Sequence, residues 1–183
     1  MIDPKLIAPF VNSVRQVFAT MVKVQTTLER PHLKSQPAPS YDVSGIIGFS
    51  GQITGSVVVS FQMQAATKLV EAFAGMALEP GTADFADAIG ELANMIAGSA
   101  KKRPRRALAS ISVPNVIIGP GHVIARLSDV PCIVIPCKTP VGDFAVEINI
   151  KHVSRQPELK DTGHEIPPRR RFPHHAEHPE KGP

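Results

Sequence analysis

The chain has 183 residues, of which 43% are hydrophobic, so it is long enough to bury one substantial core and has the usual size of one domain. Its 20 Lys and Arg residues outnumber 16 Asp and Glu residues by four, but eight of the positive charges lie in two short runs, Lys101 to Arg106 and Arg169 to Arg171. This uneven basic excess is weak evidence for nucleic-acid binding, and the sequence lacks the ~20-residue apolar stretch that would span a bilayer.

The first 22 residues have the pattern of one amphipathic helix. Asp3 followed by Pro4 is a typical helix start, with an N-cap residue before a proline in the first turn. The apolar residues recur at steps of three and four, and they are Leu6, Ile7, Phe10, Val14, Val17, Phe18 and Met21. This spacing predicts a helix from residue 4 to about residue 22.

Three strands are predicted after this helix. Val24 to Leu28 is a short strand candidate, and residues 31–39 have the composition of a loop. Ser44 to Phe49 and Ser56 to Phe61 are rich in β-forming residues, and the glycine-containing segment 51–55 joins them. The pattern predicts a hairpin with its turn at residues 51–55.

The second half of the pattern contains two helices and then three more strands. The helices run from about Ala65 to Met76 and from about Thr82 to Lys102, and Glu79-Pro80-Gly81 separates them. The strands are His122 to Leu127, Cys132 to Lys138 and Phe144 to Ile150. The order helix, three strands, two helices, three strands indicates an α+β fold: a largely antiparallel sheet of about six strands packed with three main helices.

The composition changes after residue 153, where prolines, charges and histidines replace apolar residues. Such a segment buries too little apolar surface to offset its ordering entropy. We therefore expect a folded domain at residues 1–153 and a disordered tail at residues 154–183, whose histidines are solvated rather than bound to a metal.

Cys132 and Cys137 are five positions apart in an apolar run that alternates like a strand. Side chains at an odd spacing in a strand point to opposite faces, so no disulfide between the two is expected. The N-terminus lacks the basic segment and apolar run of a signal peptide. Reduced cysteines and a cytoplasmic location are the resulting expectation.

The predicted helix at residues 82–102 has two distinct faces. The face expected to pack on the sheet carries Phe85, Ala88, Ile89, Leu92, Ile96 and Ser99, and the opposite stripe carries Asp87, Glu91, Asn94, Gly98 and Lys101. Such a stripe is usually only a solvent face. Asn94 and Gly98 favour a function, because Asn competes for backbone hydrogen bonds and Gly costs about 1 kcal/mol in a helix.

Small residues lie beside this polar stripe, and they are Ala86, Gly90, Ala93 and Ala97. They leave room for another backbone to come close to the helix. That backbone belongs either to a partner or to a neighbouring helix of the same domain.

The segment Asp87-Ala-Ile-Gly-Glu91-Leu-Ala-Asn94, with Gly98 and Pro114 after it, resembles the phosphatase motif of the CheC/CheX/FliY chemotaxis family. That motif is an Asp or Ser, three residues, Glu, two residues, Asn, and a distant Pro. The likeness covers residues 4 to about 152 and is similar to the CheX branch in its single motif copy. The interval from Asn94 to Pro114 is shorter than is usual in the family.

The resemblance implies a phospho-aspartate phosphatase that acts on a CheY-type response regulator. Asn94 would then position the attacking water, and Glu91 would pair with a Lys of the regulator. Asp87, Gly98 and Pro114 would contact the partner. The Mg²⁺ would be held by the regulator, with no metal or cofactor on this chain. A homodimer joined through sheet edges is also implied.

Two other functions are compatible with the residues. A CheX-like module could bind a receiver domain without hydrolysis. Nucleic-acid binding through the two basic runs is less favoured, because no aromatic residues are interleaved with them to stack on bases.

Overall fold

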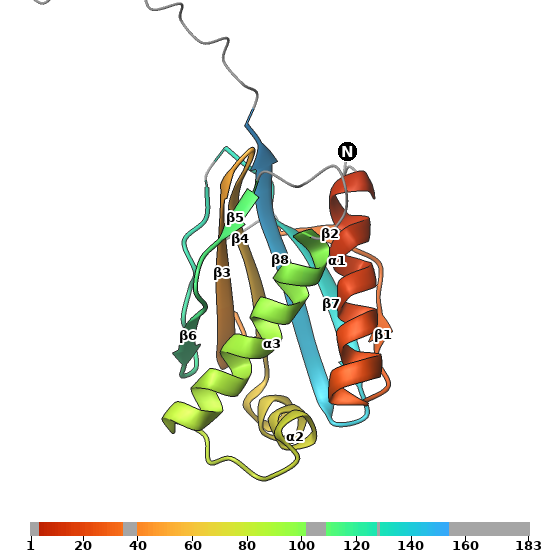
Figure 1. Cartoon of the computed structure of the whole chain (residues 1–183), viewed down its shortest axis with the longest axis vertical. Coiled ribbons are helices and arrows are strands. Elements are labelled where there is room, and N and C mark those ends of the chain that lie inside the picture. Colours follow the sequence, from red (N-terminus) through yellow and green to blue (C-terminus); the bar gives the residue numbers. More distant parts are fainter. Residues whose placement is uncertain (1–3, 35–39, 102–108, 128, 154–183) are drawn as a thin grey trace, which may run out of the picture.

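The computed structural model describes residues 4–34, 40–101, 109–127 and 129–153 (Figure 1). The helical elements are α1 (Pro4–Val17), η1 (Phe18–Val22), α2 (Met63–Ala74) and α3 (Ala83–Lys101). The strands are β1 (Thr27–Leu28), β2 (His32–Leu33), β3 (Val43–Gly51), β4 (Ile53–Phe61), β5 (Ala109–Ile111), β6 (Asn115–Ile118), β7 (Ile133–Thr139) and β8 (Gly142–His152). The predicted α+β class is confirmed.

The strands form one sheet in the order β1-β7-β8-β4-β3-β5, and every pairing among the described residues is antiparallel. β2 follows β1 along the same side of β7, and β6 follows β5 along the same side of β3. Because each edge position is shared by two short strands, the eight strands occupy six positions across the sheet. The predicted sheet of about six largely antiparallel strands therefore has the observed number of strand positions.

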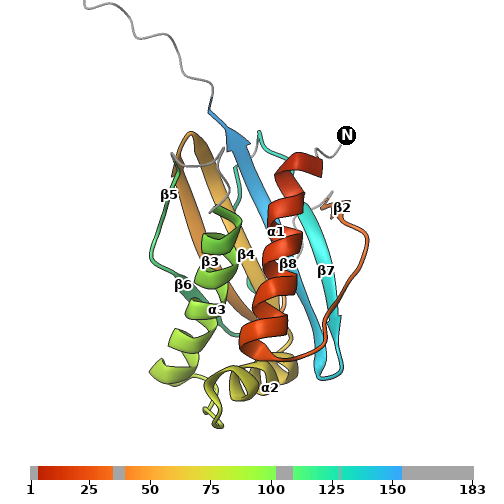
Figure 2. The same ribbon diagram turned by 45° about the vertical axis from the view of Figure 1, so that its right-hand side comes forward.

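Helices α1 and α3 lie side by side over one face of the sheet, and α2 closes the lower end (Figures 1 and 2). The core fills the space between helices and sheet, because alternate strand residues such as Val57, Val59 and Phe61 point toward the helices. Phe144 stacks on Phe18 with ring centroids 4.6 Å apart. The two layers thus share one hydrophobic core.

The predicted N-terminal helix is confirmed over residues 4–22, but its last turn differs from an α-helix. η1 is a π-helical turn, and the backbone N–H of Lys23 closes it by donating to the carbonyl oxygen of Phe18. The wider turn shifts which residue faces the core. Met21, predicted on the apolar face, is 45% exposed, whereas Val22 is only 1% exposed.

The β3–β4 hairpin is confirmed, but its turn is shorter than the predicted segment 51–55. β3 ends at Gly51 and β4 begins at Ile53, so Gly55 lies within a strand. Gly55 has a φ of +134°, and a Cβ there would come within 2.0 Å of the Asn149 carbonyl oxygen on β8. Close approach between strands, rather than a turn, explains this glycine.

The predicted strand at His122 to Leu127 is wrong, because that segment contains no strand. Its backbone groups bond elsewhere: the Leu127 N–H donates to the Asn149 side chain at 2.8 Å, and the His122 carbonyl accepts from the Ser40 N–H at 3.0 Å. The sequence pattern missed β2, β5 and β6. These short strands gain their hydrogen bonds from β7 and β3, so local alternation does not reveal them.

Both predicted central helices are confirmed. α2 ends at Gly75 in the left-handed conformation, and Thr82 caps α3 by accepting from the Phe85 N–H at 3.3 Å. Cys132 and Cys137 are free and buried on opposite faces of the sheet, as predicted. Burial raises the pKa of the Cys137 thiol to about 12, which keeps this thiol protonated at neutral pH.

Several predictions fall on residues outside the described ranges: the cap at Asp3, the basic run after Lys101, and the tail at residues 154–183. Within the described part of the chain, no helix is both long enough and apolar enough to cross a membrane.

Candidate functional site

Helix α3 buries one face on the sheet and leaves the motif stripe accessible. Phe85, Ile89, Leu92 and Ile96 are fully buried, whereas Ser99 is only half-buried. On the opposite side, Asp87 and Glu91 are exposed and Asn94 and Gly98 are half-buried. The helical period therefore places the four motif positions of α3 along one accessible stripe.

Glu91 and Asn94 are joined within this stripe. The side-chain amide nitrogen of Asn94 donates to Oε2 of Glu91 at 3.3 Å, as expected for residues three apart on a helix. That bond uses the nitrogen and not the carbonyl oxygen of the amide. The carboxylate thus orients an amide that can still offer an acceptor to a water molecule.

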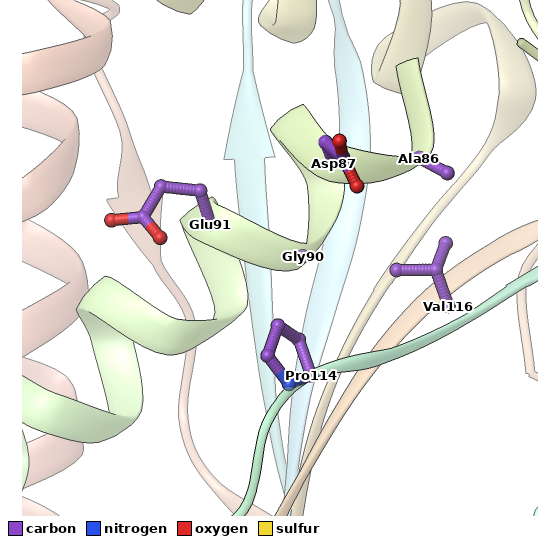
Figure 3. Close-up of a pocket in the computed structure, with 6 residues that line it drawn as sticks. All are labelled: Ala86, Asp87, Gly90, Glu91, Pro114 and Val116. Carbon is purple, nitrogen blue, oxygen red and sulfur yellow. The ribbon is translucent and has the colours of Figure 1, made fainter. Parts of the chain in front are cut away.

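A cleft of about 550 Å³ lies beside the stripe, and its lining comes from α3 and from the start of β6. Asp87 and Glu91 contribute carboxylates from successive turns of the helix, and Pro114 lies against the turn between them (Figure 3). The remaining lining residues are Ala86, Gly90 and Val116. The cleft thus has an acidic wall and an apolar wall.

Strand pairing explains why Pro114 reaches α3 from a distant part of the sequence. β5 and β6 both pair with β3, at Phe49 to Gly51 and at Val43 to Ile46. Pro114 is in the segment between these two short strands. The antiparallel register therefore fixes its position next to the helix although twenty residues separate it from Asn94.

Other parts of the same domain fill the space next to two of the small residues beside the stripe, Gly90 and Ala93. A Cβ built on Gly45 of β3 would lie 2.8 Å from the Cβ of Ala93, and one built on Gly90 would lie 3.2 Å from Pro114. The two sequence-based alternatives were a partner's backbone or a neighbouring helix. At these two positions the close neighbours are instead β3 and Pro114 of the same chain.

The structure does not bring every predicted site residue into the cleft. Asn94 lies outside the lining and is connected to it through Glu91. Gly98 is one turn further along α3, and a Cβ there would meet no atom of the described residues within 4 Å. Gly45 and Val116 are further parts of this region that local sequence patterns do not reveal, because their role depends on the pairing of Gly45 with Val116.

Chemically, the site combines two exposed carboxylates with one oriented amide. The carboxylates suit a cationic side chain of a docking partner. The amide can both donate to and accept from a small polar reactant. These groups are suited to binding a partner and positioning water.

Comparisons with known proteins identify relatives of this chain. Residues 43–138 match the family model described as "Chemotaxis phosphatase CheX". The CheY-P phosphatase CheX of Thermotoga maritima is 28% identical over 121 residues, which are 64% of this chain and 77% of that protein. A crystal structure of CheX from Desulfovibrio desulfuricans is 33% identical, has a TM-score of 0.73, and covers 81% of this chain and 99% of its own.

A more distant relative shares the fold. CheX of Borrelia burgdorferi, whose crystal structure is a complex with CheY, BeF3 and Mg²⁺, is 22% identical with a TM-score of 0.68. The alignment covers 83% of this chain and 100% of that one.

Proposed function

The chain belongs to the CheX family of chemotaxis phosphatases, and on this basis we propose that it dephosphorylates the aspartyl phosphate of a CheY-type response regulator. The observation that carries the proposal is the hydrogen-bonded pair of Glu91 and Asn94 on the accessible face of α3, next to the cleft that Pro114 completes. It puts a docking carboxylate and a water-positioning amide on one surface.

In the proposed reaction, a water oxygen attacks the phosphorus atom and the bond from phosphorus to the aspartyl oxygen breaks. The products are a free carboxylate on the regulator and inorganic phosphate, which takes the protons of the water. Such a reaction depends chiefly on positioning and charge stabilisation. The carbonyl oxygen of Asn94 would accept from the water, while the side-chain N–H that is not bonded to Glu91 would face the phosphoryl oxygens.

Glu91 and Asp87 have a docking role in this proposal. Both are exposed carboxylates that line the cleft, so they can attract a Lys side chain near the phosphorylation site of the regulator. Pro114 would provide an apolar contact on the other wall, and Gly98 would leave space for the partner. The Mg²⁺ that the reaction uses would be bound by the carboxylates of the regulator. A cytoplasmic homodimer completes the proposal.

The decisive experiment is the substitution Asn94→Ala. We expect the maximal dephosphorylation rate to fall at least ~10²-fold, the scale on which lost positioning is felt, with little change in affinity for the regulator. The assay follows phosphate release from a CheY-type regulator that has been phosphorylated with acetyl phosphate. Asn12→Ala is the matched control, because Asn12 is an exposed asparagine on α1 and should leave the rate unchanged.

The experiment also separates this proposal from its alternative. A folded Asn94→Ala variant with normal turnover would refute the water-positioning mechanism. If the wild-type protein binds the regulator but does not hydrolyse its phosphate, the chain is a receiver-binding module instead.

A further inference from the structure

We propose that Gly90 is a positioning residue for the phosphatase reaction: its missing side chain sets the distance between Pro114 and the helical turn that bears Glu91 and Asn94. This inference rests on the proposed function of the site. It assigns a role to a residue that has no side chain.

The backbone conformation of Gly90 does not require glycine. Gly90 lies in the interior of α3 and is not among the described glycines with positive φ. In such a position glycine is less favourable than alanine for helix stability. Conformational freedom therefore gives no reason for glycine here, and the reason must lie in the space around it.

The space at Gly90 is limited by Pro114 and Val116. A Cβ on Gly90 would lie 3.2 Å from both Cβ and Cγ of Pro114 and 3.5 Å from Cγ2 of Val116. The first two distances are shorter than ordinary van der Waals contacts between carbon atoms. Figure 3 shows the ring of Pro114 directed at the backbone of Gly90. An alanine at this position would push the two segments apart.

The helical turn that contains Gly90 has little room to move away from Pro114. On its sheet side, the Cβ of Ala93 would be 2.8 Å from a Cβ on Gly45, and the Ile89 carbonyl oxygen would be 3.2 Å from it. Gly45 and Val116 are register partners in the β3–β6 pair. The turn is thus held between β3 beneath it and Pro114 beside it, so an added methyl group must displace Pro114 or tilt the turn.

This displacement would affect the reaction by changing the distance from Pro114 to Glu91 and Asn94. Glu91 follows Gly90 directly, and Asn94 is one turn further along the helix. In the proposed complex, the regulator contacts Pro114 while its phosphoryl group meets the Asn94 amide. A change of a few tenths of an ångström in the separation of Pro114 and Asn94 would therefore misplace the amide relative to the phosphoryl group. Because a misplacement of about 1 Å can cost about 10²-fold in rate, we expect about a tenfold loss from this smaller shift.

The test compares Gly90→Ala with wild type in phosphate release from the acetyl-phosphate-treated regulator, together with thermal unfolding. We expect kcat to fall about tenfold while the KM for the regulator changes less than about threefold. The melting temperature should stay within a few degrees of wild type, because the gain in helix propensity offsets the strain. Gly48→Ala is the activity control, since its Cβ would only reach Ser112 at an ordinary 3.5 Å.

A double-mutant cycle identifies the cause of the loss. Pro114→Gly removes the two atoms that would lie 3.2 Å from an alanine Cβ at position 90. In that background, Gly90→Ala should change the remaining rate less than twofold. An equal loss in both backgrounds would overturn the inference, as would a fully active Gly90→Ala variant. If Gly90→Ala does not fold alone, the double variant must fold and match the rate of Pro114→Gly.

The outcomes for the two proposals are distinct. A folded wild-type protein that releases no phosphate overturns the proposed function, and the role of Gly90 with it. An active wild type with an unaffected Gly90→Ala variant overturns the role of Gly90 alone.

Discussion

The side chain of Glu91 combines two physical roles in the proposed site. Its carboxylate is exposed and lines the cleft, where it can pair with a cation. The same carboxylate accepts the hydrogen bond from the Asn94 amide at 3.3 Å. The first role depends on the charge of Glu91, whereas the second depends only on an oxygen acceptor, so two substitutions can separate them.

Glu91→Gln keeps a side-chain oxygen for the Asn94 amide but removes the charge. We expect it to weaken binding of the regulator, and this effect should shrink as salt rises, because exposed charge pairs are screened. Glu91→Ala removes both the oxygen acceptor and the charge, so it should lower kcat as well as affinity. Measurements of affinity and kcat at low and high ionic strength test these two expectations. Equal kcat values for the two variants would contradict an orienting role for the carboxylate.

At the scale of elements, the two faces of the sheet are stabilised differently. The face toward the helices packs apolar side chains, whereas the opposite face buries Ser44, Ser60, Glu147 and Asn149. Each of these polar residues has a partner. Ser44 bonds to Ser60 at 3.0 Å and to the ring of His122 at 2.8 Å, and Asn149 bonds to the backbone of Leu127 and of Val130. Side-chain hydrogen bonds therefore attach the irregular segments to this face.

The ion pair of Lys34 and Glu147 gives a test of this layer. The two side chains are 13% and 7% exposed and their charged atoms are 2.7 Å apart. Lys34→Met should lower the free energy of unfolding by about 3 kcal/mol, because it leaves the carboxylate of Glu147 buried without its partner. The double variant Lys34→Met/Glu147→Met should recover most of that loss. Urea denaturation provides the measurement.

A matched control exists on α2. Lys68 and Glu71 form an exposed pair, with side chains 58% and 44% exposed, and Lys68→Met should cost about 0.5 kcal/mol or less. Similar losses in the free energy of unfolding for Lys34→Met and Lys68→Met would show that burial does not determine how much the Lys34–Glu147 pair contributes to stability.

At the scale of the whole molecule, the sheet ends in short strands on both sides. β1 and β2 have two residues each, and β5 and β6 have three and four. Short edge strands limit the open backbone that a sheet presents to other chains. The motif stripe of α3 lies on the helical side of the sheet (Figure 1), so a second chain that pairs with an edge strand does not have to cover it.

We expect the protein to form a homodimer through one of these edges. Light scattering at micromolar concentration should give twice the mass of the chain. A proline placed at a backbone-pairing position of the correct edge should reduce the mass to that of a monomer, because proline removes a donor from the ladder. Ile118→Pro on β6 and Leu28→Pro on β1 test the two edges, because the backbone N–H groups of these two residues point away from β3 and β7. A monomeric wild-type protein would contradict the proposal.

Local hydrophobic patterns were sufficient to predict the long, strongly periodic parts of this protein. The helices α1, α2 and α3 and the central strands β3, β4, β7 and β8 were predictable, because each carries its own hydrophobic period over seven or more residues. The stripe of Asp87, Glu91 and Asn94 was predictable for the same reason. Local spacing along one helix fixes which side chains share a face, whatever the rest of the chain does.

The cleft beside this stripe depends on contacts between segments that are distant in the sequence. Pro114 lies beside Gly90 because β5 and β6 pair with β3, and those short strands have too few residues to show a period of their own. The predicted strand at His122 to Leu127 failed for a related reason. Its residues alternate between apolar and polar, but its backbone bonds to a side chain of β8 instead of to a neighbouring strand. Hydrogen bonds between distant segments are absent from any local pattern, so the position of Pro114 depends on the completed sheet.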